Sequence, residues 1–344
     1  MTIPSTEWKE SIGADEEARY EAYAARLRDL QRAAAPRTGT ANRALHAKGT
    51  GALAELTVLS NLPEHARAGL FATPATYRAY VRYSNGSGVR QADAKGDVRG
   101  LAIKVVGVSG KKIIPGMEGE TTQDFLLIRA PSIPFRNADE FIAVVTAAGQ
   151  SPLLLLPRVI GRLGLGRALG LLPDVARGLR EPMRSVATTQ YFSAAPIRYG
   201  AYAVHYALAP QTKSEPNGSI PPSADYLRED LARRLAEGPV VYDMRVQFYV
   251  DEATTPIEDA SVEWKEKDTP FVTVARLTLP QQDLDGPRGR KIADFIEGLS
   301  FDPWHALEAH RPLGNVMRAR NHAYRLSTKE RGAAGEPDGT EQFA

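Results

Sequence analysis

The feature that most constrains the fold is a set of short runs rich in β-branched and aromatic residues, separated by Gly, Asp, Lys and Asn. Such runs predict strands, and the run over 76–84 alternates apolar and polar positions as a half-buried strand does. The runs form two groups: ALAELTVL, TYRAYVRYSN, RGLAIKVVGV and QDFLLIRA, then YGAYAVHYALAP, VVYDMRVQFYV and PFVTVARLTLP. Two groups of about four strands, with helices inserted and appended, predict an α+β chain built on an antiparallel barrel.

Helical patterns lie before, between and after these groups. They cover residues 16–32, 138–185 and 316–331. Since no repeat and no long linker divides the chain, we expect an N-terminal helical arm over 1–40 and a single barrel domain over 41–331. The closing residues 332–344 are polar and rich in Gly, and they predict a disordered tail.

Composition excludes several classes of protein. The chain has no cysteine, which excludes disulfides, zinc–thiolate sites, iron–sulfur clusters, thiol peroxidases and thiolate-ligated haem. Its 43 Lys and Arg nearly balance its 41 Asp and Glu, so nothing indicates a nucleic-acid partner. The charged N-terminus lacks the apolar stretch of a signal peptide, and we therefore expect a cytoplasmic location.

One leucine-rich segment, residues 151–184, tests for a membrane span. Pro157 and the charges of Arg158, Arg162 and Arg167 interrupt it, whereas a span needs about 20 consecutive apolar residues. We therefore expect no transmembrane segment and favour a pair of short helices lying on the barrel. The alternative is an interfacial patch that admits lipid-like substrates, with leucines inward and arginines at the headgroups.

Residues able to do chemistry occur in four short stretches, of which three lie in the first strand group. His46 precedes a Gly-rich entry into a strand, where a side chain can point into a barrel mouth, although a single histidine is more often a surface or core residue. Arg82 and Ser84 share one face of a strand because they are two residues apart. The stretch KGDVRGLAIKV is a turn leading into a buried strand, which plain barrel structure explains.

The fourth stretch is the closing helix, where Arg320 and Tyr324 are four residues apart and share one face. A tyrosine must lose its proton to bind ferric iron. Holding it ionised at neutral pH requires a pKa about three units below ~10, or roughly 4 kcal/mol. A neighbouring guanidinium and the charge of the metal supply a shift of that size. An exposed helix with an incidental Arg–Tyr contact would show the same spacing.

Taken together, these stretches resemble haem catalases. HAKGTGA, VRYSNGSG, DVRGLAIK and the closing Arg-x-x-x-Tyr occur in the order and spacing of that family, and FLLIRAP, VEWKEKDTPFVTVARLTLP and FIEGLSFDP resemble catalase stretches as well. The resemblance covers residues 43–331 and is strongest to the small catalase-related peroxidases. It implies a catalase-like antiparallel eight-stranded β-barrel with inserted and C-terminal helices, and haem b as the cofactor, with ferric iron and an axial tyrosinate.

The resemblance implies roles on the distal side of the haem. His46 matches the distal histidine, and Ser84 matches a serine that hydrogen-bonds it. True catalases carry an asparagine across the haem from that histidine. Aligned on Ile128–Arg129, this chain has Thr122 there, with Gln123 next to it. Because that amide positions the second hydrogen peroxide, its absence implies weak or no catalase activity and retained peroxidase activity.

The resemblance also implies the residues that hold the haem. Tyr324 matches the axial ligand and Arg320 its partner. Three arginines match those that hold the haem propionates: Arg43, Arg82 and Arg331. Phe135 is a candidate for the ring stacked on the haem face, although the loop around it differs in length from that of the family.

The implied function is reduction of hydrogen peroxide or organic hydroperoxides by an organic electron donor, in a homo-oligomer (dimer or tetramer). One alternative is a fatty-acid hydroperoxide isomerase such as coral allene oxide synthase, which shares the scaffold but carries a threonine immediately before the distal histidine. Here that residue is Leu45. The other alternative is a non-enzymatic haem carrier. Carriage alone needs no distal acid–base group, so the presence of His46 argues against it.

Overall fold

The computed structural model describes residues 4–34, 43–150, 155–180, 183–212, 214 and 219–343. The strands are β1 (Gly49–Val58), β2 (Thr76–Asn85), β3 (Arg99–Val106), β4 (Thr122–Ile128), β5 (Tyr191–Phe192), β6 (Ile197–Tyr199), β7 (Tyr202–Pro210), β8 (Val240–Phe248) and β9 (Val272–Leu279). The α-helices are α1 (Glu16–Ala34), α2 (Ala138–Gln150), α3 (Leu155–Leu163), α4 (Leu165–Arg180), α5 (Tyr226–Glu237), α6 (Pro287–Gly298) and α7 (Asn315–Glu330).

The strands close into a barrel, as the sequence predicts. Their order is β5-β4-β3-β2-β1-β9-β8-β7-β6, and all pairs are antiparallel. The ends of this sheet meet because β5 pairs with β4 on one side and with β7 on the other. Short β6 extends the same edge of β7, so eight strands form the closed ring. The eight-stranded antiparallel barrel is confirmed, and each of the seven strand-like runs forms a strand.

Strand alternation gives the barrel two different faces. Inward-facing side chains such as Val81, Tyr83 and Ile103 form the main hydrophobic core. The intervening positions face outward, and Tyr80 packs there against Ile296 of α6 in a second core. Because a methyl group on Gly51 would lie only 2.8 Å from Ile296, this glycine allows α6 to approach β1 closely.

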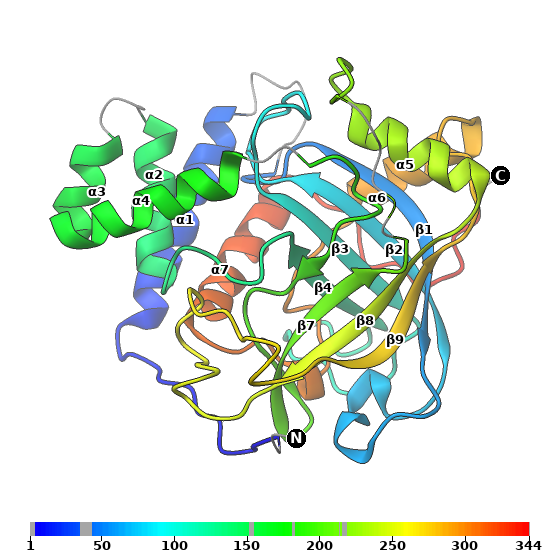
Figure 1. The fold of residues 1–344 in the computed structure, drawn as a ribbon, viewed down its shortest axis with the longest axis horizontal. Helices are drawn as coiled ribbons and strands as arrows, with labels where there is room; N and C mark the ends of the chain where they lie inside the picture. Colours follow the sequence, from blue (N-terminus) through cyan, green and yellow to red (C-terminus); the bar gives the residue numbers. More distant parts are fainter. Residues whose placement is uncertain are drawn as a thin grey trace.

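The helices predicted over 16–32, 138–185 and 316–331 are all present, with α2, α3 and α4 in the middle section. Helices α1 to α4 lie together on one side of the molecule (Figure 1). The pair α3–α4 differs from the prediction because it packs on α2 and not directly on the barrel. Its buried side chains, among them Val159, Ala168 and Leu171, join Val144 and Ala147 of α2 in a separate core. Among the described residues, no helix combines the length and apolarity needed to cross a membrane.

The prediction of a disordered tail is wrong for residues 332–343. This segment has no helix or strand, but its side chains have fixed partners on the barrel and on α6. Glu336 forms a buried ion pair with Lys104, and Phe343 packs edge-on against Phe295. Composition predicts disorder when a segment has few apolar residues of its own. It does not reveal a buried cation elsewhere in the chain that the segment can neutralise.

Candidate functional site

The candidate site lies on the outer face of β1, β2 and β3, at the end where β1 begins. Register places two rows of residues side by side across these strands: Gly49–Ser84–Gly100 and Gly51–Arg82–Ala102. Four of these six residues are Gly or Ala, so little side chain rises from the floor. A methyl group on Gly100 would lie 3.0 Å from Ser84 Oγ and 3.4 Å from His46 Cε1. The floor is therefore low at Gly100 beside His46, whereas the Arg82 guanidinium covers Gly49 and Ile296 of α6 covers Gly51.

His46 lies in the loop before β1, and its backbone holds its ring in place. Its φ of 61° falls in the left-handed region, which a histidine adopts only when its surroundings require it. The ring Nδ1 lies 2.6 Å from the carbonyl oxygen of Asn85 and 3.1 Å from Ser84 Oγ. A carbonyl oxygen can only accept a hydrogen bond, so Nδ1 carries the proton. The lone pair on Nε2 is therefore free.

The surroundings of His46 also fix its charge. Burial, followed by the positive charge of Arg82, lowers the pKa of His46 to about 4. Arg43 and Arg320 act in the same direction, whereas the hydrogen bond to Asn85 opposes them. The imidazole is therefore neutral at neutral pH, and Nε2 is a base ready to accept a proton.

Three arginines from distant parts of the chain meet at the C-terminal end of α6. Arg43 and Arg82 both form ion pairs with the carboxylate of Glu297, at 2.6 Å and 2.9 Å. Arg331, the C-cap residue of α7, donates to the Glu297 and Leu299 carbonyl oxygens, and Arg43 donates to the same two. Gly49 permits this arrangement because a methyl group there would overlap the Arg82 guanidinium.

This arginine cluster carries more positive charge than its single carboxylate can balance. Burial, together with the neighbouring arginines, lowers the pKa of Arg43 to about 8 and that of Arg331 to about 10. Arg43 and Arg82 share the carboxylate of Glu297, and Arg331 donates only to backbone carbonyl oxygens, so the described residues around the three guanidinium groups supply one negative charge for three positive ones. A ligand with two carboxylates supplies the missing charge. Sequence reasoning missed Glu297, because a glutamate in the last turn of a helix looks like an ordinary surface residue.

Arg320 and Tyr324 lie one turn apart on α7. Arg320 Nη2 donates to the Tyr324 hydroxyl at 3.0 Å, and its guanidinium carbon lies 5.0 Å from the centre of the Tyr324 ring. Burial lowers the pKa of Arg320, but the charge and hydrogen bond of Tyr324 outweigh it, and the net shift is upward. Arg320 thus stays charged beside the phenol oxygen, and its charge also reaches His46.

The start of α7 explains how the pair is held. Gly314 precedes the helix with a φ of 84°, and a methyl group there would overlap the carbonyl oxygen of Ile257. Arg318, on the next turn, forms ion pairs with Glu10, Glu16 and Glu258. The helix that carries Tyr324 is therefore fixed at both ends, by these carboxylates and by the contacts of Arg331.

The structure does not bring Thr122 and Gln123 to His46. Gly100, which lies against His46, pairs with Ile128 at the opposite end of β4 from Thr122, and six residues of strand span about 20 Å. Thr122 Oγ1 donates to Glu336 at 2.6 Å, and Gln123 accepts from the Leu307 N–H at 2.8 Å. The strand register and these hydrogen bonds argue against the assignment of the two residues to the distal side, which stays a prediction. The alignment equates positions in sequence, whereas strand register sets where each residue lies.

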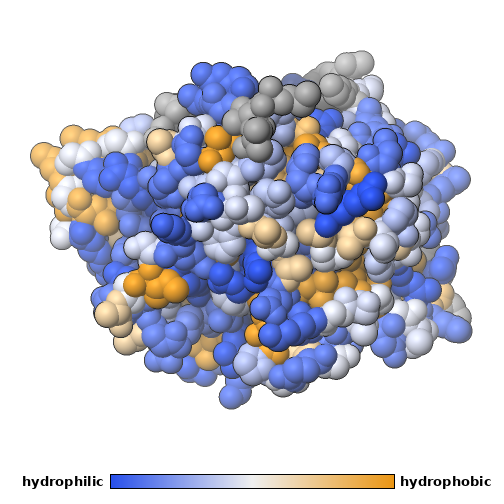
Figure 2. All heavy atoms as spheres, turned by 90° about the horizontal axis from the view of Figure 1, so that it is seen from below, coloured by the Kyte–Doolittle hydropathy of each residue, from blue (hydrophilic) through white to orange (hydrophobic). Residues whose placement is uncertain are grey.

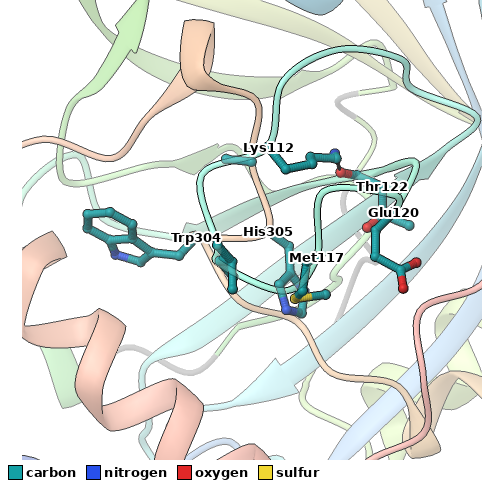
Figure 3. A pocket seen from close by; sticks show the side chains of 8 residues that line it. Lys112, Met117, Glu120, Thr122, Trp304 and His305 are labelled. Atoms are coloured by element: carbon teal, nitrogen blue, oxygen red, sulfur yellow. Dashed lines mark hydrogen bonds between the residues drawn. The ribbon is translucent and has the colours of Figure 1, made fainter.

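Thr122 lines a different, small pocket with Lys112, Met117, Glu120 and Trp304 (Figure 3). The Trp304 ring points away from this pocket, and its Nε1 donates to the Met317 carbonyl oxygen at 2.7 Å. His305 also lines the pocket, but His46 does not. This pocket is separate from the candidate site.

A charge-balanced cluster adjoins that pocket. Lys104 Nζ lies 2.7 Å from Asp124 Oδ1 and 2.5 Å from Glu336 Oε2, and none of the three side chains is more than 3% exposed. His305 Nδ1 lies 3.3 Å from Asp124 and 3.2 Å from Glu336. These donor atoms are close enough together to ligate a metal. Burial and Lys104 lower the pKa of His305, but Asp124 outweighs them and the net shift is upward, which favours a second positive charge. Lys104 and His305 together then face the two carboxylates, so the cluster is explained without a metal.

We expect that replacing Thr122 by Val will lower the free energy of unfolding by about 1–3 kcal/mol, because Glu336 loses a hydrogen bond to its buried carboxylate. The same change should leave peroxide-dependent donor oxidation unaltered, because the side chain lies far from His46. Urea unfolding and steady-state kinetics check the two expectations. If Thr122→Val lost turnover while its stability was unchanged, Thr122 would instead act on the distal side of the haem.

Phe135 also lies elsewhere than expected. Its ring is 8% exposed and packs with Val144, Val159 and Leu171 in the core shared by α2, α3 and α4. It makes an edge-to-face contact with Phe141, with ring centres 5.4 Å apart. Phe135 thus packs in the helical core, which argues against its assignment as the ring stacked on the haem, and that assignment stays a prediction. The loop around Phe135 differs in length from that of the catalases, so an alignment by sequence can equate Phe135 with a residue that lies at another position in the fold.

The haem implied by the sequence resemblance fits the remaining residues. Two carboxylates match the positive charge of the arginine cluster, and Gly100 leaves the strand surface beside His46 without a side chain. The Tyr324 oxygen, with Arg320 beside it, is a donor suited to ferric iron. The residues present would thus satisfy the charge and the ligand preference of the cofactor.

Comparison with known proteins places the chain in a family. A family model described as Catalase matches residues 26–114. A catalase-related peroxidase from Mycolicibacterium paratuberculosis (strain ATCC BAA-968 / K-10) is 31% identical over 319 residues, which cover 86% of this chain and 92% of that protein.

Solved catalase structures share the fold at lower identity. A bacterial catalase superposes with a TM-score of 0.64 at 19% identity, covering 97% of this chain and 64% of that one. Catalase A from Saccharomyces cerevisiae superposes with a TM-score of 0.67 at 16% identity, covering 96% and 67%. The chain thus spans about two thirds of the length of these solved catalases. Since its identity to the peroxidase extends over most of both proteins, the chain belongs to the catalase family of enzymes.

Proposed function

We propose that this protein is a haem b peroxidase that reduces hydrogen peroxide or an organic hydroperoxide with electrons from an organic donor. Tyr324 would ligate the iron, and the arginine cluster of Arg43, Arg82 and Arg331 would hold the propionates. The observation that carries the proposal is the state of His46. Its Nδ1 donates a hydrogen bond to the Asn85 carbonyl oxygen, so Nε2 carries the unprotonated lone pair. The imidazole is neutral at pH 7 because its pKa is lowered to about 4. A protein that only carried haem would need no such base.

His46 would act as the proton shuttle of the reaction. Haem supplies the redox chemistry when bound, passing two electrons to the peroxide O–O bond. His46 Nε2 accepts the proton of the incoming hydroperoxide and returns it to the departing oxygen, which leaves as water from hydrogen peroxide or as an alcohol from an organic hydroperoxide. In balance, one hydroperoxide and two donor molecules of the type AH give an alcohol (or water), water and two donor radicals. Asn85 and Ser84 hold the ring so that only Nε2 exchanges protons.

The same site favours peroxidation over dismutation of hydrogen peroxide. Dismutation needs a second peroxide held in place on the distal side. The two residues considered as a substitute for the positioning amide, Thr122 and Gln123, are engaged with Glu336 and Leu307. We therefore propose weak or no catalase activity, with an organic molecule as the reductant.

Two measurements on purified, haem-loaded protein test the proposal. The visible spectrum should show a Soret band with the charge-transfer features of high-spin ferric tyrosinate haem. Mixing with a fatty-acid hydroperoxide and a phenolic donor should give the alcohol and oxidised donor. Rearranged epoxide and ketol would identify an isomerase, and vigorous oxygen evolution from hydrogen peroxide would identify a true catalase. A colourless protein that does not bind added haem would refute the whole proposal.

A further inference from the structure

The helix pair α3–α4 presents an unusual apolar surface to solvent. Among the described residues, five large hydrophobic side chains are at least a third exposed, and three of them belong to this pair. They are Leu156 at 43%, Leu165 at 59% and Leu169 at 58%, whereas Ile12 and Val98 lie elsewhere in the chain. Leu165 and Leu169 are four residues apart on α4 and therefore share one face. A soluble helix pair would normally place charged residues at such positions.

Glycine and proline make this surface smooth and open. Gly161, Gly164, Gly166 and Gly170 lie along the two helices, and a methyl group at any of them would meet nothing within 4 Å. Gly164 joins the helices with a φ of 80°. Four glycines in or between helices lower helix stability, so local helix propensity does not explain them. Because these glycines have no side chains, no bulky group beside the exposed leucines blocks a partner from contacting them.

The charge of this region has one sign. Residues 141–173 contain no Asp or Glu and three arginines. Arg167 pairs with Glu140 at 2.6 Å. Within the described parts of the chain, Arg158 and Arg162 have no carboxylate partner, and Arg158 Nη1 is buried without a hydrogen-bond partner. The apolar face is thus accompanied by two guanidinium groups that lack a counter-ion.

The position of the pair suits contact with an extended surface. Helices α3 and α4 form the extreme edge of the molecule, away from the barrel (Figure 1). In the view from below, a patch of hydrophobic residues covers that same edge, at the left of the picture (Figure 2). The pair is supported by α2 through its own core. Contact there would therefore leave the region of His46 undisturbed.

We propose that α3–α4 docks on the surface of an anionic phospholipid bilayer. Leu156, Leu165 and Leu169 enter the boundary between headgroups and acyl chains, and the positive charges of Arg158 and Arg162 attract the headgroup phosphates. A second copy of the chain fits this surface less well. A twofold contact would bring the same positively charged face against itself, because residues 155–180 contain five arginines and one acidic residue, Asp174.

Vesicle flotation tests the proposal with the full-length protein. We expect it to float with vesicles of phosphatidylcholine and phosphatidylglycerol and to remain in the lower fraction with phosphatidylcholine alone. The double variant Leu165→Asp/Leu169→Asp should reduce the floated fraction at least tenfold. Arg158→Gln/Arg162→Gln should weaken binding to the anionic vesicles and reduce its dependence on salt concentration. Vesicle binding requires no turnover, so the result is independent of the proposed peroxidase activity.

The matched control is Ile12→Asp, which places a carboxylate at an apolar side chain that is 67% exposed on another part of the molecule. It should float like the unaltered protein, and circular dichroism should show that all variants are folded. Failure of the unaltered protein to float with anionic vesicles overturns the proposal. Equal flotation with both lipid compositions overturns the role of the arginines. A dimer in lipid-free buffer that the leucine variant dissociates, without any vesicle binding, assigns the face to self-association instead.

Discussion

Replacing Tyr324 by Phe is expected to lower peroxide-dependent donor oxidation by at least ~10³-fold and to remove the tyrosinate charge-transfer bands from the visible spectrum. The side chain keeps its ring and loses only the oxygen that would ligate iron, which lies 3.0 Å from Arg320 Nη2. Without that oxygen the iron loses the axial ligand whose electron density helps break the O–O bond, and a loss of about three orders of magnitude corresponds to roughly 4 kcal/mol of transition-state stabilisation at 1.36 kcal/mol for each tenfold change. Spectra and steady-state kinetics of the haem-loaded variant provide the measurements.

The matched control for this change is Tyr77→Phe. Tyr77 lies on β2, is half-buried, and pairs in register with Leu56 at the far end of the strand from Ser84. Removing its hydroxyl group makes the same chemical change without touching the site, so spectrum and turnover should be preserved. If Tyr324→Phe kept the charge-transfer bands, another residue would have to be the axial ligand.

Replacing His46 by Asn is expected to slow the reaction with peroxide by about 10²–10⁴-fold, the range found when a positioned acid–base group is lost. Asn is chosen because it tolerates the left-handed backbone that His46 adopts at a φ of 61°. Haem content should be unchanged, because the arginine cluster and Tyr324 are intact. Stopped-flow kinetics of the reaction with hydrogen peroxide, with haem content measured in parallel, check both expectations.

The pH dependence of the unaltered enzyme follows from the same residue. Burial and Arg82 lower the pKa of His46 to about 4, and the neutral form is the active base. The rate constant with peroxide should therefore be constant at neutral pH and decrease as the pH falls through about 4, where the ring becomes protonated. His65→Asn provides the control, since His65 packs against Phe248 with ring centres 4.9 Å apart. A rate that already fell near pH 6.5 would mean that the His46 ring is not shielded as the structure indicates.

The local pattern of the sequence was sufficient for much of the fold. The alternation over 76–84 placed β2 correctly because neighbouring side chains on a strand point to opposite faces whatever the rest of the chain does. The spacing of Arg320 and Tyr324 likewise predicted their contact, because one helical turn fixes it. Helix α5 was not predicted, although its buried Tyr226, Leu227 and Leu231 are helically spaced.

Long-range contacts were beyond the reach of the sequence. Nothing near Glu297 or Glu336 in the chain indicates that the first gathers Arg43 and Arg82 or that the second pairs with Lys104. The closing segment therefore looked disordered, although it neutralises a buried cation. Such partners depend on which surfaces the fold brings together. The residues next to a charged residue in the sequence do not predict which distant residue will form an ion pair with it.

The sequence by itself thus determined the strands, the principal helices and the family resemblance, because these depend on periodicity and on motif order. Only the tertiary structure decided that Thr122 lies about 20 Å along β4 from the level of His46. It likewise decided that Phe135 belongs to the core of α2–α4, and that Arg43 and Arg82 share the carboxylate of Glu297. Register and packing set these positions, and both are properties of segments distant in sequence that become neighbours only when the chain is folded.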